Sequence, residues 1–251
     1  MATFIPFQEG DTVDSIDRVF ASAWTNNTND LGANHFSSSL QYVTTTSSSS
    51  GAFFMEIYNA HPVNDTTAEV QYSIAYGNRV GSGSLDFATG TGATGFSAAK
   101  SVYTQYRNLV YGGDETQNFS FDGHVPNDIF AINVNRARYK NALRMGNLSL
   151  ILSGSGGKKL QLTDDSVTTS GSANAIRPGV GREFNLVSGS NGIRLGSSNT
   201  YITNSGSYGY VYPDAGLILL NGDALNASSS VGGIDLSINR GPNANGTNPA
   251  K

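Results

Sequence analysis

Short segments in which every second residue is hydrophobic, separated by clusters of glycine, serine and asparagine, constrain this chain to a β-rich fold. Residues 70–76 are the clearest example, with valine, tyrosine and isoleucine at alternate positions. Successive side chains of a strand point to opposite faces, so this period predicts a half-buried strand. Further strands are predicted at 52–58, 119–121, 129–134, 148–152, 159–162, 184–187, 208–212 and 217–220. The spacing predicts a mainly β protein with sandwich-like antiparallel sheets.

One principal α-helix is predicted at about residues 98–111. Ser97 can cap its start, and the pair Gly112–Gly113 can end it. A helical period places five apolar or aromatic side chains on one face, namely Val102, Tyr103, Tyr106, Leu109 and Val110. Packed on a sheet, this helix would bury its tyrosine rings and leave Lys100 outside.

Composition restricts the class of protein. The chain has 251 residues, enough for a sizeable core, and only 14% of them are charged, against about 25% in a typical globular protein. A net charge of -4 argues against nucleic acid as a partner. Because cysteine is absent, disulfides, thiol catalysis and thiolate metal sites are excluded. We also expect neither a signal peptide nor a membrane span, since no long apolar run occurs.

Three regions are expected along the chain. Residues 1–50 are expected to form an N-terminal arm or loosely packed layer, and the alternative is an irregular N-terminal segment of the main domain. Within them we expect a short helix from Asp14 to Trp24 and a loop or linker from Thr44 to Gly51. Residues 51–238 form the main β-rich domain. Residues 239–251 predict a flexible C-terminal tail, because Gly, Asn and Pro dominate there and offer nothing to bury.

The motifs for catalysis and metal binding are weak. His124 lies in a sequence typical of a tight turn, and none of the three histidines has metal-ligand spacing. Asp164 and Asp165 are the best paired carboxylates, yet neighbouring strand residues point to opposite faces, so a solvated turn is the favoured interpretation. The glycine-rich segments at 77–83 and 154–157 lack the phosphate-binding pattern and predict hairpin turns. We therefore predict no enzyme, no cofactor and no metal.

A cationic and aromatic cluster follows one strand directly. Over 129–134 the alternation places Ile129, Ala131 and Asn133 on one face of that strand, and after it come four such side chains, Arg136, Arg138, Tyr139 and Lys140. Tyr106 and Arg107 repeat this mixture upstream. Arginine and tyrosine are enriched at interface hot spots, so these six residues are our candidate assembly interface. The alternatives are a charged edge strand ending in a solvated turn, or an internal ion pair between Arg138 and an aspartate.

A second tyrosine-rich segment runs from 208 to 214. Strand alternation would put Tyr208, Tyr210 and Tyr212 on one face as a candidate aromatic stripe. Such a stripe can pack in the core, meet a protein partner or stack on sugars. The first two interpretations are favoured, because a sugar site also needs convergent polar groups.

Three segments, 101–112, 127–140 and 207–225, resemble virion structural proteins of contractile-tailed bacteriophages. The similarity is greatest to baseplate wedge-like proteins of phages that infect cyanobacteria, and it covers roughly residues 50–230. It implies a non-enzymatic subunit of the virion tail, made in the host cytoplasm, present in several copies and held by other tail or baseplate proteins. It is a similarity of short runs, without a diagnostic catalytic motif.

The sequence therefore predicts a structural subunit of a phage tail, in the baseplate, that docks neighbouring subunits. Three alternatives remain open: a neck or tail-completion protein, a carbohydrate-binding module of a receptor-binding fibre, and a polysaccharide hydrolase. The sugar-binding alternative requires exposed tyrosine rings near 208–212. The hydrolase requires two carboxyl groups that face each other about 5–10 Å apart.

Overall fold

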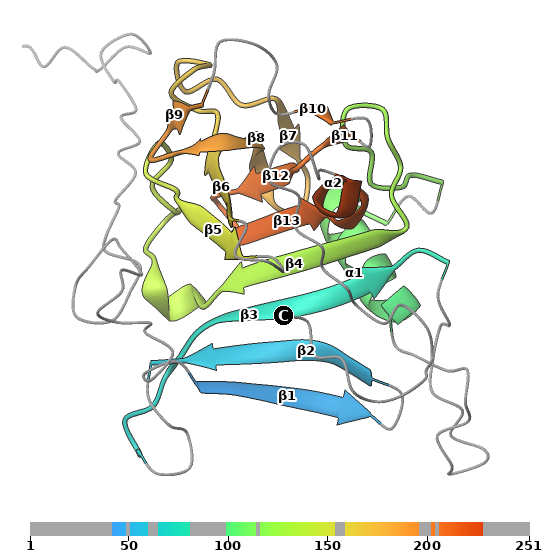
Figure 1. Ribbon diagram of the computed structural model, residues 1–251, viewed down its shortest axis with the longest axis vertical. Helices are drawn as coiled ribbons and strands as arrows, with labels where there is room; N and C mark the ends of the chain where they lie inside the picture. Colours follow the sequence, from blue (N-terminus) through green and yellow to red (C-terminus); the bar gives the residue numbers. More distant parts are fainter. Residues whose placement is uncertain are drawn as a thin grey trace, which may run out of the picture.

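A long antiparallel sheet dominates the computed structural model, which describes residues 42–48, 51–59, 65–80, 99–113, 116–153, 159–195, 202–203 and 206–227 (Figure 1). The strands are β1 (Tyr42–Ser48), β2 (Gly51–Tyr58), β3 (Val70–Asn78), β4 (Asp128–Val134), β5 (Leu150–Ser153), β6 (Lys159–Asp164), β7 (Ala175–Arg177), β8 (Gly181–Ser190), β9 (Ile193–Arg194), β10 (Ile202–Thr203), β11 (Gly206–Ser207), β12 (Gly209–Tyr212) and β13 (Leu217–Asn221). The helices are α1 (Ala99–Tyr111), the 3-10 turn η2 (Arg136–Arg138) and α2 (Gly222–Ala227).

The main sheet contains strands from both ends of the described chain, because β4 pairs with β13. Its order is β1-β2-β3-β4-β13-β12-β8-β6-β5, with β7 and β9 also paired to β8, and β10 and β11 form a separate pair. Every pairing is antiparallel. In Figure 1 the strands β1 to β4 cross the lower half, and the remaining strands curl upward above them. The prediction of a mainly β fold with antiparallel strands is confirmed.

The central strands β4 and β13 are buried on both faces. Ile129 and Ala131 belong to one apolar cluster, whereas Phe130 and Ile132 belong to the other. This confirms the alternation predicted from the sequence, and it gives the sheet two cores. Tyr103 of α1 lies in the first cluster and Leu225 of α2 in the second, so the two helices cover opposite faces. Figure 1 shows α2 in front of the sheet and α1 behind it.

Helix α1 lies where the sequence places it and ends at the predicted glycines. Gly112 and Gly113 have positive φ values of 75° and 87°, which glycine adopts without steric cost. The helix packs closely on β3, since a Cβ on Gly77 would lie 2.9 Å from the Tyr103 nitrogen. Tyr103 is buried, but Leu109 is 44% exposed. The expectation that Leu109 faces the sheet is therefore wrong, because it lies beside the buried stripe of the helix rather than on it.

The serine- and threonine-rich run before residue 51 does not form the expected loop. Residues 42–48 form β1, which pairs along its length with β2. Threonine suits strands, and the pairing satisfies backbone groups that β2 would otherwise leave open. The predicted helix from Asp14 to Trp24 and the tail at 239–251 lie outside the described residues. Among the described helices, none has the length and apolar character to span a membrane.

Candidate functional site

The cationic segment after β4 is fixed to the start of β3 by Asn135. The side-chain oxygen of Asn135 accepts a hydrogen bond of 3.0 Å from the Ala137 nitrogen and so caps η2. Its side-chain nitrogen donates to the Val70 carbonyl at 2.9 Å, and its backbone nitrogen donates to the Gln71 carbonyl at 3.0 Å. These bonds hold η2 in one position at the end of the sheet.

Three of the predicted interface residues are used within the chain. Arg136 donates to the Tyr139 carbonyl at 2.7 Å, and its guanidinium lies 4.6 Å from the centre of the Tyr139 ring. Arg138 forms an ion pair of 2.5 Å with Glu69, which precedes β3. The Tyr139 ring is buried against Gly216, and burial raises its pKa. Arg138 therefore forms an internal ion pair, as the alternative interpretation predicts, but its partner is a glutamate instead of an aspartate.

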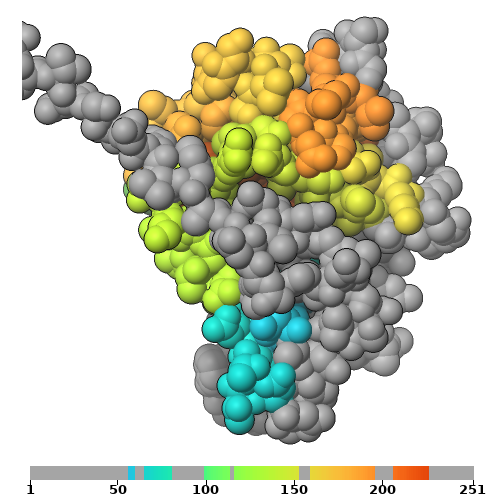
Figure 2. Space-filling view, turned by 90° about the vertical axis from the view of Figure 1, so that its left-hand side faces the viewer, coloured from blue at the N-terminus to red at the C-terminus, as the bar shows by residue number. Residues whose placement is uncertain are grey.

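Two other cations of the same segment, Lys140 and Arg144, are exposed. Arg136 is exposed as well although its guanidinium contacts Tyr139, and we call these three residues the basic ridge. Within the part of the chain that the structure describes, Lys140 and Arg144 form no ion pair. No Asp or Glu occurs between residues 129 and 163, a stretch that contains six Lys and Arg residues. Figure 2, which faces the left-hand side of Figure 1, shows yellow-green atoms of this stretch at the surface.

Tyr106 and Arg107 lie on α1 and not on η2. The Tyr106 hydroxyl accepts a short hydrogen bond from the Asn133 side chain, which fixes α1 to β4. Burial raises the pKa of Tyr106. The Arg107 guanidinium donates to the Asn108 side chain at 3.0 Å. Of the six candidate interface residues, the structure therefore gathers four at the end of β4 and leaves two on the helix.

The candidate aromatic stripe is in the core. Tyr208 and Tyr212 are fully buried and Tyr210 is 8% exposed. The expected common face is wrong for Tyr208, which belongs to one apolar cluster while Tyr210 and Tyr212 belong to the other. The reason is local, because Tyr208 falls in a bend between β11 and β12. A platform of exposed rings for sugar stacking is not formed by these three residues.

Each hydroxyl of the last two tyrosines has a specific partner. Tyr210 donates to the Ser120 carbonyl at 2.7 Å, and its ring stacks on Phe121 with centroids 4.9 Å apart. Tyr212 donates to Glu183 at 2.9 Å. Burial raises the pKa of Tyr210 to about 12 and that of Tyr212 well above its ordinary value.

The paired aspartates at 164 and 165 are buried, so the expected solvated turn is wrong. Asp164 accepts hydrogen bonds from the Gly146 nitrogen at 2.9 and 3.0 Å and from the Ser166 nitrogen at 3.2 Å. Asp165 accepts two bonds from Asn185, at 2.9 and 3.0 Å. Burial raises the Asp165 pKa. These contacts compensate for burial, and they give both carboxylates a structural role in joining loops to the sheet.

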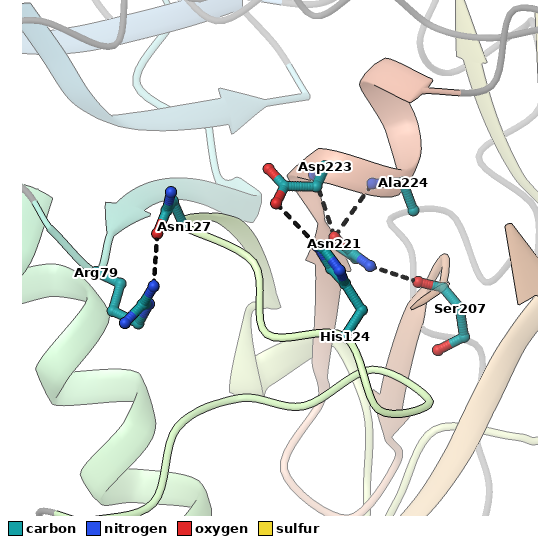
Figure 3. A network of polar contacts seen from close by, with 7 residues as sticks. All are labelled: Arg79, His124, Asn127, Ser207, Asn221, Asp223 and Ala224. Atoms are coloured by element: carbon teal, nitrogen blue, oxygen red, sulfur yellow. Dashed lines mark hydrogen bonds and ion pairs between the residues drawn. The ribbon is translucent and has the colours of Figure 1, made fainter. Parts of the chain in front are cut away.

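His124 has a partner that the sequence does not indicate. It closes the predicted turn with Phe121, in which Asp122 and Gly123 have positive φ values. Its Nε2 atom lies 3.0 Å from a carboxylate oxygen of Asp223, which is 99 residues further along the chain. Figure 3 shows this pair where α2 begins. No local pattern could have revealed it, because the turn and α2 meet only in the folded chain.

The polar network in Figure 3 continues through Asn221. The Asn221 side chain accepts from the Asp223 and Ala224 nitrogens at 3.1 and 3.2 Å and donates to the Ser207 carbonyl at 2.8 Å. These bonds cap α2 and fix it to β11. The network therefore fixes the position of α2 relative to β11 and to the turn that contains His124. No group of three or more metal-ligating side chains occurs among the residues that the structure describes.

The chain matches no protein-family model, no curated protein and no solved structure. Residues 101–112, 127–140 and 207–225 form α1, then β4 with η2, and then the run from β11 to α2. The last two segments meet in the centre of the sheet, where β4 pairs with β13 and β13 with β12. α1 packs on this sheet, and its Tyr106 hydroxyl accepts from the Asn133 side chain of β4.

Proposed function

We propose that this chain is a structural subunit of a contractile phage tail, in the baseplate, and that the basic ridge binds an acidic surface of a neighbouring subunit. The sequence resemblance supports the class of protein. The ridge supports the docking role, because it combines exposed cations with a rigid attachment to the sheet.

Rigidity supports this proposal because a subunit that transmits force must not deform at its contacts. The sheet has a core on each face, with fully buried side chains such as Phe119, Leu162 and Leu219. η2 is fixed by Asn135, by the Arg138–Glu69 ion pair and by the packing of Tyr139 on Gly216. An interface presented on such a support loses little conformational entropy when it binds.

Charge distribution is the observation that carries the proposal. Residues 129–195 contain nine Lys and Arg residues and only three carboxylates, Asp164, Asp165 and Glu183. All three carboxylates are buried. The rest of the chain has six Lys and Arg residues against sixteen Asp and Glu residues. The basic ridge thus belongs to a segment with an excess of cations in an otherwise acidic chain, and charge complementarity of this kind steers association and fixes the orientation of partners.

The test reverses the outward charges and leaves the inward ones intact. In the variant Lys140→Glu/Arg144→Glu the isolated chain should keep the thermal unfolding midpoint of the unaltered chain, because both side chains are exposed. Its incorporation into tails, measured by immunoblotting purified particles, should fall at least about tenfold. Lys100→Glu, at an exposed position of α1, is the matched control and should incorporate normally.

Two results would overturn the proposal. One is normal incorporation of the doubly reversed variant. The other is binding of the unaltered chain to duplex DNA at physiological salt with loss of that binding in the variant, which would assign the basic ridge to nucleic acid.

A further inference from the structure

A second surface, next to the basic ridge, exposes aliphatic side chains of two strands and a turn. Ile151 of β5 is 55% exposed, Val167 in the turn after β6 is 58% exposed, and Ile193 of β9 is 73% exposed. We call these three residues the β5–β9 surface. Isolated exposed aliphatic side chains are ordinary, but a group of them on one face marks an interaction site.

Strand pairing and side-chain hydrogen bonds bring Ile151 and Ile193 into one region. Ile151 pairs with Gln161, whose side chain donates to the Ser149 hydroxyl at 2.9 Å. Ser149 lies 3.3 Å from the Ser190 hydroxyl, and Ser190 pairs with Ile193. The Gly192 nitrogen donates to the Thr163 hydroxyl at 2.7 Å, and Thr163 lies on the same face of β6 as Gln161, so the β8–β9 hairpin with Ile193 lies against the face that carries Ile151.

Val167 joins the same region through glycine. A Cβ on Gly192 would lie 2.5 Å from a methyl carbon of Val167, and one on Gly146 would lie 3.1 Å from it. Gly192 directly precedes Ile193, and Gly146 follows Arg144 by two residues. The glycines thus allow Val167 to pack where the ridge meets the β8–β9 hairpin.

The surroundings of this surface are cationic. Arg144 and Lys159 are exposed, and Arg194 is half-buried beside Ile193. The two aspartates of the region, Asp164 and Asp165, are buried and hydrogen-bonded. In Figure 2 the yellow-green atoms of the ridge region lie beside yellow and orange atoms of the later strands. The occupant that fits is an acidic segment with aliphatic and aromatic side chains.

The chain contains such a segment in its own residues 8–24. This segment has four carboxylates, at Glu9, Asp11, Asp14 and Asp17, against a single arginine. It also contains Ile16, Val19, Phe20 and Trp24, which helical spacing would place on one face. An amphipathic helix with an apolar face and acidic flanks complements an apolar surface surrounded by cations.

We propose that residues 8–24 of one copy dock on the β5–β9 surface of a second copy. This inference rests on the proposed function, because it requires several copies to meet in one assembly. A contact between two different surfaces is heterologous, and repetition of it closes a ring when the rotation between copies allows. The attraction between charges makes the contact sensitive to salt.

The test uses the full chain and its single tryptophan, Trp24. As the protein concentration rises at low salt, we expect Trp24 emission to shift to shorter wavelength while sedimentation velocity shows larger species. Added salt should reverse both changes. A synthetic peptide of residues 8–24 should compete and return the sedimentation coefficient to that of a single copy.

Two variants test whether the β5–β9 surface makes the contact. Ile193→Asp should weaken self-association at least about tenfold, because it places a carboxylate on the contact and adds repulsion to the acidic segment. Ile176→Asp, at a residue of β7 that is 80% exposed, is the matched control and should leave self-association unchanged. Equal self-association of Ile193→Asp and the unaltered chain would overturn the inference.

Two further outcomes distinguish docking between copies from other arrangements. A short-wavelength emission that does not depend on concentration but is lost in Ile193→Asp would assign the surface to the chain's own segment and overturn docking between copies. Incorporation into tails without any response of Trp24 would overturn this inference alone. Loss of incorporation in Lys140→Glu alone, with self-association unchanged, tests the proposed function separately, because Lys140 is not among the cations that surround the β5–β9 surface.

Discussion

Replacing Arg177 by methionine should destabilise the fold strongly, because it removes the partner of a buried carboxylate. Glu183 is only 2% exposed. Arg177 donates to its two oxygens at 2.8 and 3.0 Å, and Tyr212 donates to one of them at 2.9 Å. The hydrogen bond with Glu183 raises the pKa of Arg177. The Arg177 guanidinium also lies 5.0 Å from the centre of the Tyr111 ring.

The expected cost follows from the burial of the two partners. Removing one member of a buried ion pair costs about 3–5 kcal/mol, because the other charge stays buried without compensation. The Arg177 side chain is 28% exposed, so water can partly replace it and we expect a loss of about 3 kcal/mol. Loss of the contact with Tyr111 is included in this value. A domain is stable by only about 5–15 kcal/mol, so the change is large.

Urea unfolding followed by circular dichroism measures the loss directly. The double variant Arg177→Met/Glu183→Gln should recover about 2 kcal/mol, since the amide carries no charge and its oxygen still accepts from Tyr212. Arg138→Met is the matched control: its partner Glu69 is 52% exposed, so its loss should stay below about 1 kcal/mol. A loss below about 1 kcal/mol for Arg177→Met, or no recovery in the double variant, would refute the reasoning.

Two further predictions concern the clamp on η2 and the buried tyrosines. Gly216→Ala should lower the free energy of unfolding by about 2 kcal/mol, because φ is +65° and the new Cβ would lie 2.5 Å from the Tyr139 ring. Gly113→Ala is the control: its φ is +87° but no atom lies within 4 Å of the new Cβ, so it should cost about half as much. Equal losses in the two variants would contradict the steric clash with Tyr139. The pKa of Tyr210 is raised from 10.0 to about 12, so the folded chain keeps a proton that the unfolded chain releases. The stability that this proton contributes is present in full below pH 10, and about 2 kcal/mol of it is lost as the pH rises from 10 to 12. Urea unfolding across that range measures the slope, and an unchanged slope in Tyr210→Phe would be inconsistent with this assignment.

The central strands could be predicted because their period reflects burial on both faces. In residues 129–134 both sets of alternate side chains are apolar enough to pack, and the structure places them in two cores. Helix α1 could be predicted because its period and its terminal glycines agree. β1 could not, because serine and threonine are common in loops and its pairing depends on a partner strand.

The candidate site was predicted only in part. The cluster at 136–140 is visible in the sequence as a local concentration of charge and aromatic rings. Which of its side chains turn inward depends on Glu69 and Gly216, which lie in other strands or turns and carry no local signal. The pairing of His124 with Asp223 and the burial of Asp164 depend on tertiary contacts in the same way.

A density map of the assembled tail that contains this chain tests the docking account most directly. We predict that Lys140 and Arg144 face carboxylates of a neighbouring subunit, while Arg136 and Arg138 keep the internal contacts seen in the single chain. A map in which the basic ridge faces solvent, with neighbours bound elsewhere on the sheet, would contradict the account.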